Sequence, residues 1–343
     1  MLYPSKFDRR GTTAMGAKLK VNRRRVSWLL ATTLACGIAT HATAADNRIH
    51  IQHDPDKGKM TVIVDGRPAI EYNYGSTVDL PHYYPVYSPS GKSLTVQFHP
   101  KRDPHHRSFY FADRVRFGTN AAVTFYSCYY SRLNPGDPQS PFTNHIRHVQ
   151  FLPEKITNNE AEFGMKQVWE MNMKVPVLDQ LSQVRFVALG SGEYFMDLRY
   201  TVTASYGDVR FVSDDVHYAW PFIRMAQEYS AAKGGRLINS HRQIGQKATH
   251  GQAADWVDYS NTLGGITEGI ACFANPDIKE PQRWLTRDYG IFGVRRVDDK
   301  NGRPFTLKRG ECIKQHVGVL VHSGNEQGGK VAQRYQQFLN GTL

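Results

Sequence analysis

Apolar side chains recur at every second position in many separate segments of this 343-residue chain. Strand-like patterns of this kind occur in residues 49–53, 60–64, 68–72, 94–98, 121–126, 269–273 and 316–322, and residues 194–202 form a long segment with apolar residues on both faces. A period of two places successive side chains on opposite faces of a strand. Asp65 and Gly66 form a hairpin signal between two of these segments. Only residues 330–339 form a strong helical pattern. The sequence therefore predicts an all-β protein, a large two-sheet antiparallel β-sandwich with few short helices.

Residues 1–44 are predicted to be a signal peptide. A basic stretch ends at residues 23–25, an apolar stretch too short for a typical transmembrane helix follows at 26–39, and residues 42–44 offer a small-x-small cleavage site. We expect cleavage before Ala45 and a single domain over residues 45–343, in the periplasm or outside the cell.

Two details of this export signal stay open. Cys36 lies in a sequence that resembles a lipoprotein box, and residues 23–25 also allow a twin-arginine signal. Because the basic stretch lies far from Met1, Met15 is an alternative start. None of these alternatives changes the predicted compartment.

The composition argues against a nucleic-acid partner. The chain has 43 Lys and Arg against 31 Asp and Glu, but residues 1–44 hold eight of the basic residues and one of the acidic ones. The remainder of the chain is only mildly basic, and no apolar run after the leader is long enough to span a membrane.

Three cysteines remain after cleavage: Cys128, Cys272 and Cys312. They allow at most one disulfide, and the sequence does not decide its pairing.

A loop between two prolines concentrates polar side chains. His99, His105 and His106 lie within residues 98–107, where Pro100 and Pro104 favour extended backbone. Adjacent side chains on extended backbone point to opposite sides, so His105 and His106 are expected to have different roles, one packed inward and one in solvent. These three histidines are also the candidate ligands for a transition metal, copper or zinc, as the alternative to no cofactor.

Further candidates follow along the chain. His145 lies on a predicted strand and could line the same cleft, with His148 on the opposite face. His217 is flanked by Asp215 and by aromatic residues, which suits acid–base chemistry, or it is a buried histidine bonded to backbone. Polar and aromatic residues also interleave around residues 256–260 and 281–284, which fits carbohydrate binding and a polar core seam equally well. The sequence contains no phosphate-binding glycine loop, Gly-x-Ser-x-Gly elbow or dinucleotide fingerprint.

Several motifs of this chain occur together in a specific order. They are Pro100-x-x-Asp103-Pro104-His105-His106-Arg107, Trp256-Val257-Asp258-Tyr259, Ala274-Asn275-Pro276, Pro281-Gln282-Arg283-Trp284, Arg287-Asp288-Tyr289-Gly290, Leu307-x-x-Gly310-Glu311 and Val321-His322-Ser323-Gly324. In this order they resemble the bacterial family labelled PmoA-like, also known as the DUF6807 domain, over nearly all of residues 45–343. The label suggests methane oxidation, but the chain lacks the several membrane spans of a methane monooxygenase subunit, so we interpret the label as inherited.

The resemblance implies a galactose-mutarotase-like supersandwich and carbohydrate processing outside the cytoplasm. In mutarotase-like enzymes a histidine and a carboxylate exchange protons around a sugar ring. By this analogy the catalytic candidates are His217, His106, Asp215, Asp258 and Glu311. The candidates for sugar binding are His105, Arg107, His145, Arg224, Trp256, Tyr259 and Trp284.

Three functions remain as hypotheses. A hydrolase, lyase or epimerase requires His106, His217 and a carboxylate in one cleft. A non-catalytic glycan-binding module requires an aromatic platform without a histidine–carboxylate pair in hydrogen-bond reach. A copper or zinc enzyme, such as an oxygenase, requires three histidines with ring nitrogens within about 4 Å of one another.

Overall fold

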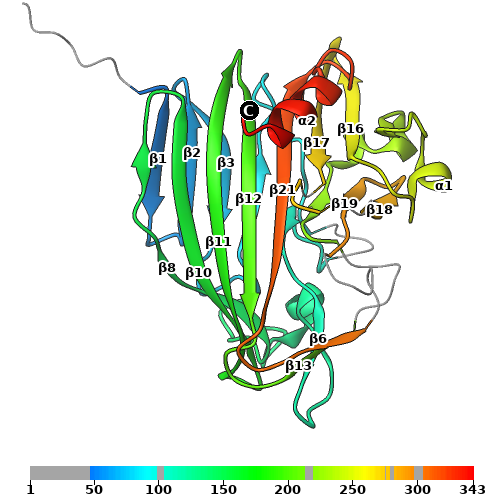
Figure 1. Ribbon diagram of the computed structural model, residues 1–343. Helices are drawn as coiled ribbons and strands as arrows, with labels where there is room; N and C mark the ends of the chain where they lie inside the picture. Colours follow the sequence, from blue (N-terminus) through cyan, green and yellow to red (C-terminus); the bar gives the residue numbers. More distant parts are fainter. Residues whose placement is uncertain (1–46, 99–103, 213–218, 275, 279–281, 297–303) are drawn as a thin grey trace, which may run out of the picture. The chain divides into compact units, whose positions relative to one another are not determined.

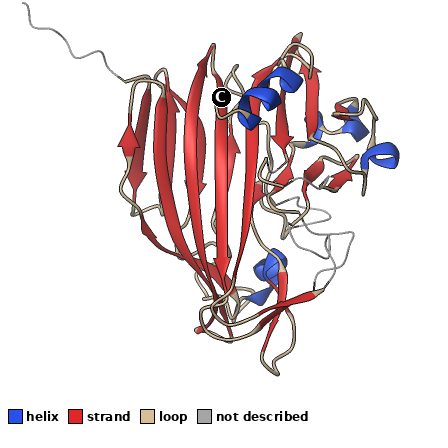
Figure 2. Cartoon of the chain, viewed as in Figure 1, coloured by secondary structure: helices blue, strands red, loops and turns tan. Residues whose placement is uncertain are grey.

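The computed structural model describes residues 47–98, 104–212, 219–274, 276–278, 282–296 and 304–343. Residues Ala45–Leu343 form one compact unit, built mostly of antiparallel strands (Figures 1 and 2). The predicted all-β class is confirmed. The predicted signal peptide lies outside the described residues, and within them no helix is long and apolar enough to cross a membrane.

The first large sheet has eight strands. In the order in which they lie side by side, they are β1 (Ile49–Asp54), β2 (Lys59–Val64), β3 (Arg67–Asn73), β4 (His82–Val86), β5 (Phe109–Tyr110), β14 (Phe222–Arg224), β19 (Ile291–Val294) and β18 (Trp284–Arg287). Asp65 and Gly66 connect β2 to β3 as predicted, and both have positive φ angles, as tight hairpin turns require. At the other end of the sheet, β14 lies between β5 and β19, so segments far apart in the sequence meet there.

The second large sheet has nine strands, and a smaller sheet has four. The nine are β15 (Arg236–Asn239), β16 (Trp256–Leu263), β17 (Ile266–Phe273), β21 (Cys312–Ser323), β12 (Glu193–Thr203), β11 (Val175–Gly190), β10 (Glu160–Met171) and β8 (His145–Phe151), with β9 (Lys155–Ile156) beside β10. The four are β20 (Phe305–Leu307), β13 (Val209–Phe211), β6 (Arg114–Phe117) and β7 (Val123–Thr124).

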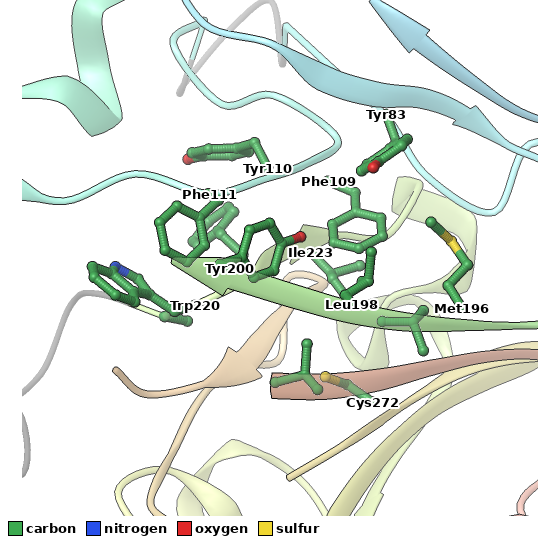
Figure 3. Close-up of a cluster of buried hydrophobic side chains, with 14 of the residues drawn as sticks. Tyr83, Phe109, Tyr110, Phe111, Met196, Leu198, Tyr200, Trp220, Ile223 and Cys272 are labelled. Carbon is green, nitrogen blue, oxygen red and sulfur yellow. The ribbon is translucent and has the colours of Figure 1, made fainter. Parts of the chain in front are cut away.

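The main core lies between the two large sheets. Along β12, alternate side chains such as Met196, Leu198 and Tyr200 belong to this core, because a strand directs every second residue to the same face. Figure 3 shows these side chains packed against residues of the first sheet such as Ile223. The ring of Phe111, next to β5, stacks on Tyr200 with centroids 4.3 Å apart. The alternating apolar side chains of β12 therefore supply part of the core that joins the two sheets.

The outer face of the second sheet carries a smaller apolar cluster under helix α2 (Val331–Leu339). Phe195 of β12 belongs to it and lies 5.4 Å from the ring of Phe338 in the helix. This contact explains the apolar residue on the second face of residues 194–202, and helix α2 confirms the predicted C-terminal helix. The other described helices are short: α1 (Gln246–Thr249) and the 3₁₀ helices η1 (Phe125–Ser131), η2 (Gln227–Tyr229) and η3 (Ala231–Lys233).

Two of the predicted strands are wrong. Residues 94–98 contain only an isolated bridge at Thr95, and Phe98 has a φ angle of 55°, which ends the extended backbone. Within residues 121–126, only the short β7 is a strand, and helix η1 begins directly after it. Short alternating runs fit an irregular packed segment as well as a strand.

The three cysteines of the predicted mature domain are free thiols, so none of them pairs with another. Cys128 and Cys272 are buried, and Cys312 is exposed.

Candidate functional site

A cavity of about 300 Å³ lies beside η1 and the strands β14, β18 and β19. Its lining residues are His105, His106, Thr124, Tyr126, Ser127, Phe222, Leu285, Arg287, Tyr289 and Ile291. We call it the His105–His106 cavity. Its volume is at the lower end of the range for small-molecule sites.

The two adjacent histidines lie together in this cavity. Pro104 and His105 form a turn, and the ring centroids of His105 and His106 are 4.3 Å apart. The expectation that they point to opposite sides is therefore wrong, because it assumed extended backbone. His105 is partly exposed, and its Nδ1 lies 3.2 Å from the hydroxyl oxygen of Tyr130. The structure thus places two titratable rings in one site.

Arg224 orients the second histidine. His106 is 6% exposed and Arg224 at the end of β14 is 3% exposed, and Nη1 of Arg224 lies 2.9 Å from Nδ1 of His106. A guanidinium can only donate, so Nδ1 of His106 accepts and a neutral ring carries its proton on Nε2. The backbone N–H of Arg224 donates to the carbonyl of Ser108 at 2.6 Å, which fixes β14 beside the histidine loop. Arg224 was a predicted sugar-binding residue and His106 a predicted catalytic one, and the contact between their side chains defines the tautomer of His106.

Aromatic rings form the walls of the cavity. Tyr126 of η1 meets Phe222 edge to face, with centroids 4.8 Å apart, and its ring centroid lies 6.0 Å from that of His106. On another wall, the guanidinium of Arg224 lies 5.2 Å from the ring centroid of Tyr289, within the range of a cation–π contact. Aromatic rings and a few convergent polar groups are typical of a small-molecule site.

The turn between β18 and β19 carries Arg287 and Tyr289 to the cavity. Gly290 has a φ angle of 99°, a conformation that glycine adopts without strain, and its N–H donates to the carbonyl of Arg287 at 3.0 Å. The carbonyl of Gly290 accepts from the N–H of Met225 at 2.7 Å, which ties the turn to β14. A Cβ at Gly290 would lie 3.2 Å from the carbonyl oxygen of Met225, so the turn leaves little room for a side chain.

Arg107 follows the two histidines in sequence but does not line the cavity. Its Nε donates to Oδ1 of Asp79 at 2.7 Å, and both residues are buried. Its guanidinium also lies 3.9 Å from the ring centroid of Phe98. Burial, and then the charge of Arg107, lower the pKa of His82 to about 4. Arg107 is therefore one member of a buried ion pair, and through Phe98 it fixes the first residue of the loop 98–107.

Two other predicted residues also lie elsewhere. Nε2 of His145 is 3.0 Å from Oε2 of Glu170, and His145 does not line the His105–His106 cavity. Burial, outweighing the nearby Glu170 carboxylate, lowers the pKa of His145. Glu311 is exposed in the turn before β21, where it accepts the N–H of Lys308 at 2.8 Å. Neither side chain is a partner for His106.

The Trp256–Tyr259 motif is split by the alternation of β16. Trp256 belongs to the cluster under α2, whereas Tyr259 belongs to the main core. Asp258, two positions from Trp256, is fully buried and pairs with His322, with Oδ2 2.6 Å from Nε2. These residues therefore do not form one binding surface, because strand geometry places them on two faces.

Tyr259 and Trp284 support the cavity from within the core. The hydroxyl of Tyr259 lies 3.0 Å from the carbonyl oxygen of Arg287 and 3.1 Å from that of Asp288, so it can donate to this turn. The indole N–H of Trp284 donates to the carbonyl of Ala254 at 2.8 Å, and the side chain is fully buried. Both residues are buried, and neither lines the His105–His106 cavity.

Three of the predicted residues, His99, Asp215 and His217, lie outside the described residues. The acid–base pair built on His217 and the metal site built on His99 therefore stay predictions. Within the described part of the chain, no group of three or more His, Cys, Asp or Glu residues is placed to hold a metal ion.

The structure adds three prominent cavity residues that were not predicted: Tyr126, Arg287 and Tyr289. The sequence did hold a signal for two of them, because Arg287-Asp288-Tyr289-Gly290 is a polar segment ending in glycine, as exposed turns often are. Tyr126 carried no such signal, since it lies in a segment that was interpreted as a strand.

Comparison with known proteins gives a family but no curated relative. The profile of a family described as a family of unknown function (DUF6807) matches residues 59–336. No curated protein matches the chain in sequence.

The solved structures that resemble the chain are distant. The GH36 α-galactosidase AgaB from Geobacillus stearothermophilus has a TM-score of 0.36 at 11% identity, over 82% of this chain and 42% of its own. A polysaccharide lyase has a TM-score of 0.37 at 11% identity, over 84% of this chain and 34% of its own. A GalM/aldose epimerase homologue from C. elegans has a TM-score of 0.29 at 10% identity, over 81% of this chain and 98% of its own. The chain spans less than half the length of the first two proteins.

Proposed function

This chain belongs to the DUF6807 family, and we propose that it binds and processes a carbohydrate in the His105–His106 cavity. The PmoA-like label that the sequence motifs suggested is not part of the family match. The proposal therefore stands on the contents of the cavity.

The observation that carries the proposal is the orientation of His106 by Arg224 between aromatic walls. The flat apolar faces of tyrosine rings complement the C–H faces of a sugar ring, while histidine and arginine nitrogens serve its hydroxyl groups. A cavity of about 300 Å³ suits a ligand of one or two sugar units.

The same arrangement suits proton transfer. With Nδ1 accepting from Arg224, His106 is a neutral ring whose Nε2–H can donate a hydrogen bond to a sugar oxygen and stabilise negative charge that develops there. His105 places a second imidazole beside it. Proton transfer at sugar oxygens and carbons is the chemistry shared by hydrolases, lyases and epimerases. Asp215 and His217 remain the proposed carboxylate and histidine that would complete the acid–base set.

A non-catalytic glycan-binding module is the second candidate. It is favoured by one specific observation: none of the described residues that line the cavity is acidic. A binding module needs no histidine–carboxylate pair, whereas most acid–base mechanisms at sugar rings use one.

A binding and turnover experiment separates the candidates. Mono- and disaccharides are screened for binding to the full chain by calorimetry and for conversion by NMR, with His106→Gln as the test variant. The control is His50→Gln, because His50 is exposed on β1 and does not line the cavity. In an enzyme, His106→Gln should lower turnover by about 10²–10⁴-fold. Binding without turnover supports the module, and sugar binding that His106→Gln leaves unchanged would contradict both candidates.

We also propose that the protein is exported. The expected mature N-terminus is Ala45, and sequencing the N-terminus of protein recovered from the periplasm or the medium tests it. Recovery of the uncleaved chain in the cytoplasm would contradict this.

A further inference from the structure

We propose that the sugar bound in the His105–His106 cavity carries an anionic substituent, a carboxylate, sulfate or phosphate, and that Arg287 binds this group. The inference rests on the proposed carbohydrate function and specifies the class of its ligand. It follows from the distribution of charge around the cavity.

The described lining of the cavity contains cationic and titratable basic groups but no acid. Arg287, His105 and His106 all line it, and none of the described lining residues is an aspartate or glutamate. The guanidinium of Arg224, bonded to His106, lies directly behind this wall. A cationic group in a concave site raises the local concentration of anionic ligands.

Arg287 forms no ion pair with a described residue. It is partly exposed, and its Nη1 donates to the backbone carbonyl of Thr286 at 3.0 Å. The neighbouring carboxylate of Asp288 is engaged elsewhere, because its Oδ1 accepts the N–H of Gln246 at 2.7 Å and its side chain does not line the cavity. The charge of Arg287 is therefore available at the cavity wall.

Two of the buried arginines in this fold pair with a carboxylate. Arg107 pairs with Asp79, and Arg296 pairs with Asp113. Arg287 is partly exposed and has no such pair with a described residue, so a ligand can supply the anionic group.

A guanidinium also fits the geometry of the proposed group. Its planar set of N–H donors matches the paired oxygens of a carboxylate, and it binds sulfate and phosphate in the same manner. Tyr289, two residues along the same turn, provides an aromatic face for the sugar ring beside the charged group. The turn would then bind both parts of one acidic sugar.

Matched ligands test this inference on the full chain. Glucose and galactose are compared by calorimetry with their uronic acids, 6-phosphates and 6-sulfates, so that only the substituent at C6 changes. We expect at least one acidic sugar to bind about tenfold or more tightly than its neutral parent. The identity of that ligand distinguishes a carboxylate from a sulfate or phosphate.

Variants at Arg287 assign the effect to this residue. Arg287→Gln should reduce the preference for the acidic sugar to about threefold or less, whereas Arg287→Lys, which keeps the charge, should retain part of it. Arg283→Gln is the matched control, because Arg283 lies just before the same strand, donates to a backbone carbonyl and does not line the cavity. It should keep the full preference. Circular dichroism and thermal unfolding establish that each variant is folded.

The outcomes separate this inference from the proposed function. If neutral sugars bind as tightly as every acidic derivative, the anionic ligand is overturned and the carbohydrate function stands. If Arg287→Gln keeps the full preference, the role of Arg287 is overturned. If no sugar of either kind binds, the carbohydrate function fails, and this inference fails with it.

Discussion

Replacing Asp258 by alanine should destabilise the fold and leave sugar binding unchanged. The sequence motif placed Asp258 among the catalytic candidates, but the structure pairs it with His322 on the outer face of the nine-stranded sheet. Neither side chain is exposed, and neither lines the His105–His106 cavity. This substitution therefore tests a structural role directly against a catalytic one.

The magnitude follows from the contacts of the carboxylate. Oδ2 lies 2.6 Å from Nε2 of His322, and Oδ1 accepts the hydroxyl of Ser260 at 3.0 Å. Removing one member of a buried ion pair leaves the other unpaired and typically costs about 3–5 kcal/mol. Asp258→Asn keeps an acceptor for Ser260 and a neutral hydrogen bond to His322, so we expect a loss of about half that size.

The effect should depend on pH with a defined sign. Burial opposes the charge on His322, but the Asp258 carboxylate outweighs it and raises the pKa of His322 above 6.5. A raised pKa in the folded state contributes stability that is complete below the unfolded value and is lost as the pH rises through the folded value. The difference in unfolding free energy between wild type and Asp258→Ala should thus be largest below about pH 6.5 and should narrow as the pH rises above it.

Urea unfolding of wild type, Asp258→Ala and Asp258→Asn across this pH range measures the effect. Asp208→Asn is the control, because Asp208 is exposed and pairs with Lys308 at the surface, so no measurable change is expected. The reasoning is refuted if Asp258→Ala is as stable as wild type yet loses sugar turnover. A stability difference that grows with pH would refute the assigned charge of the pair.

Three further predictions follow from the same structure. Gly290→Ala should cost about 1–3 kcal/mol of unfolding free energy and weaken sugar binding, since the φ angle of 99° is strained for alanine. Urea unfolding measures the loss of stability and calorimetry the loss of affinity. An unchanged affinity would contradict the role of this turn in the site. Trp284→Ala should cost about 3–5 kcal/mol because the indole is fully buried, and a variant that is as stable as wild type but loses sugar binding would restore Trp284 as a binding residue. Thiol labelling of the folded protein, read out by peptide mass spectrometry, should modify Cys312, whereas Cys128 and Cys272 should react only after unfolding. Burial raises the pKa of Cys128 and raises that of Cys272 to about 12, so neither forms the reactive thiolate readily. Labelling of either buried thiol in the folded protein would contradict this prediction.

The long strands could be predicted because their pattern repeats over many residues. Residues 194–202 illustrate this, since alternate residues of β12 lie in the main core and Phe195, on the other face, lies under α2. Short patterns were less informative. Residues 94–98 alternate as a strand does, yet their conformation is set by the turn at Phe98 and by the hydrogen bond from its N–H to the carbonyl of His106 at 3.0 Å. Such local overrides come from tertiary contacts that a single sequence does not display.

The same period of two would have corrected part of the predicted site. Applied to residues 256–259, it separates Asp258 from Tyr259 and so excludes a shared binding surface on β16. Asp258 and Tyr259 became site candidates through the family resemblance, without use of the alternation on which the fold prediction depended. In a motif that lies on a strand, only every second side chain belongs to the same surface.

The cavity itself depends on pairings that no local pattern contains. Arg224 reaches His106 because β14 pairs with β5 on one side and with β19 on the other. The second pairing also places the Arg287–Gly290 turn beside β14, where the N–H of Met225 binds Gly290. Three segments separated by more than sixty residues along the chain thus meet at the end of one sheet. The histidines could be recognised from sequence because polar residues crowded into one loop are conspicuous. Arg287 could not, because it lies in a separate segment and only the pairing of the strands brings it to the wall of that loop's cavity.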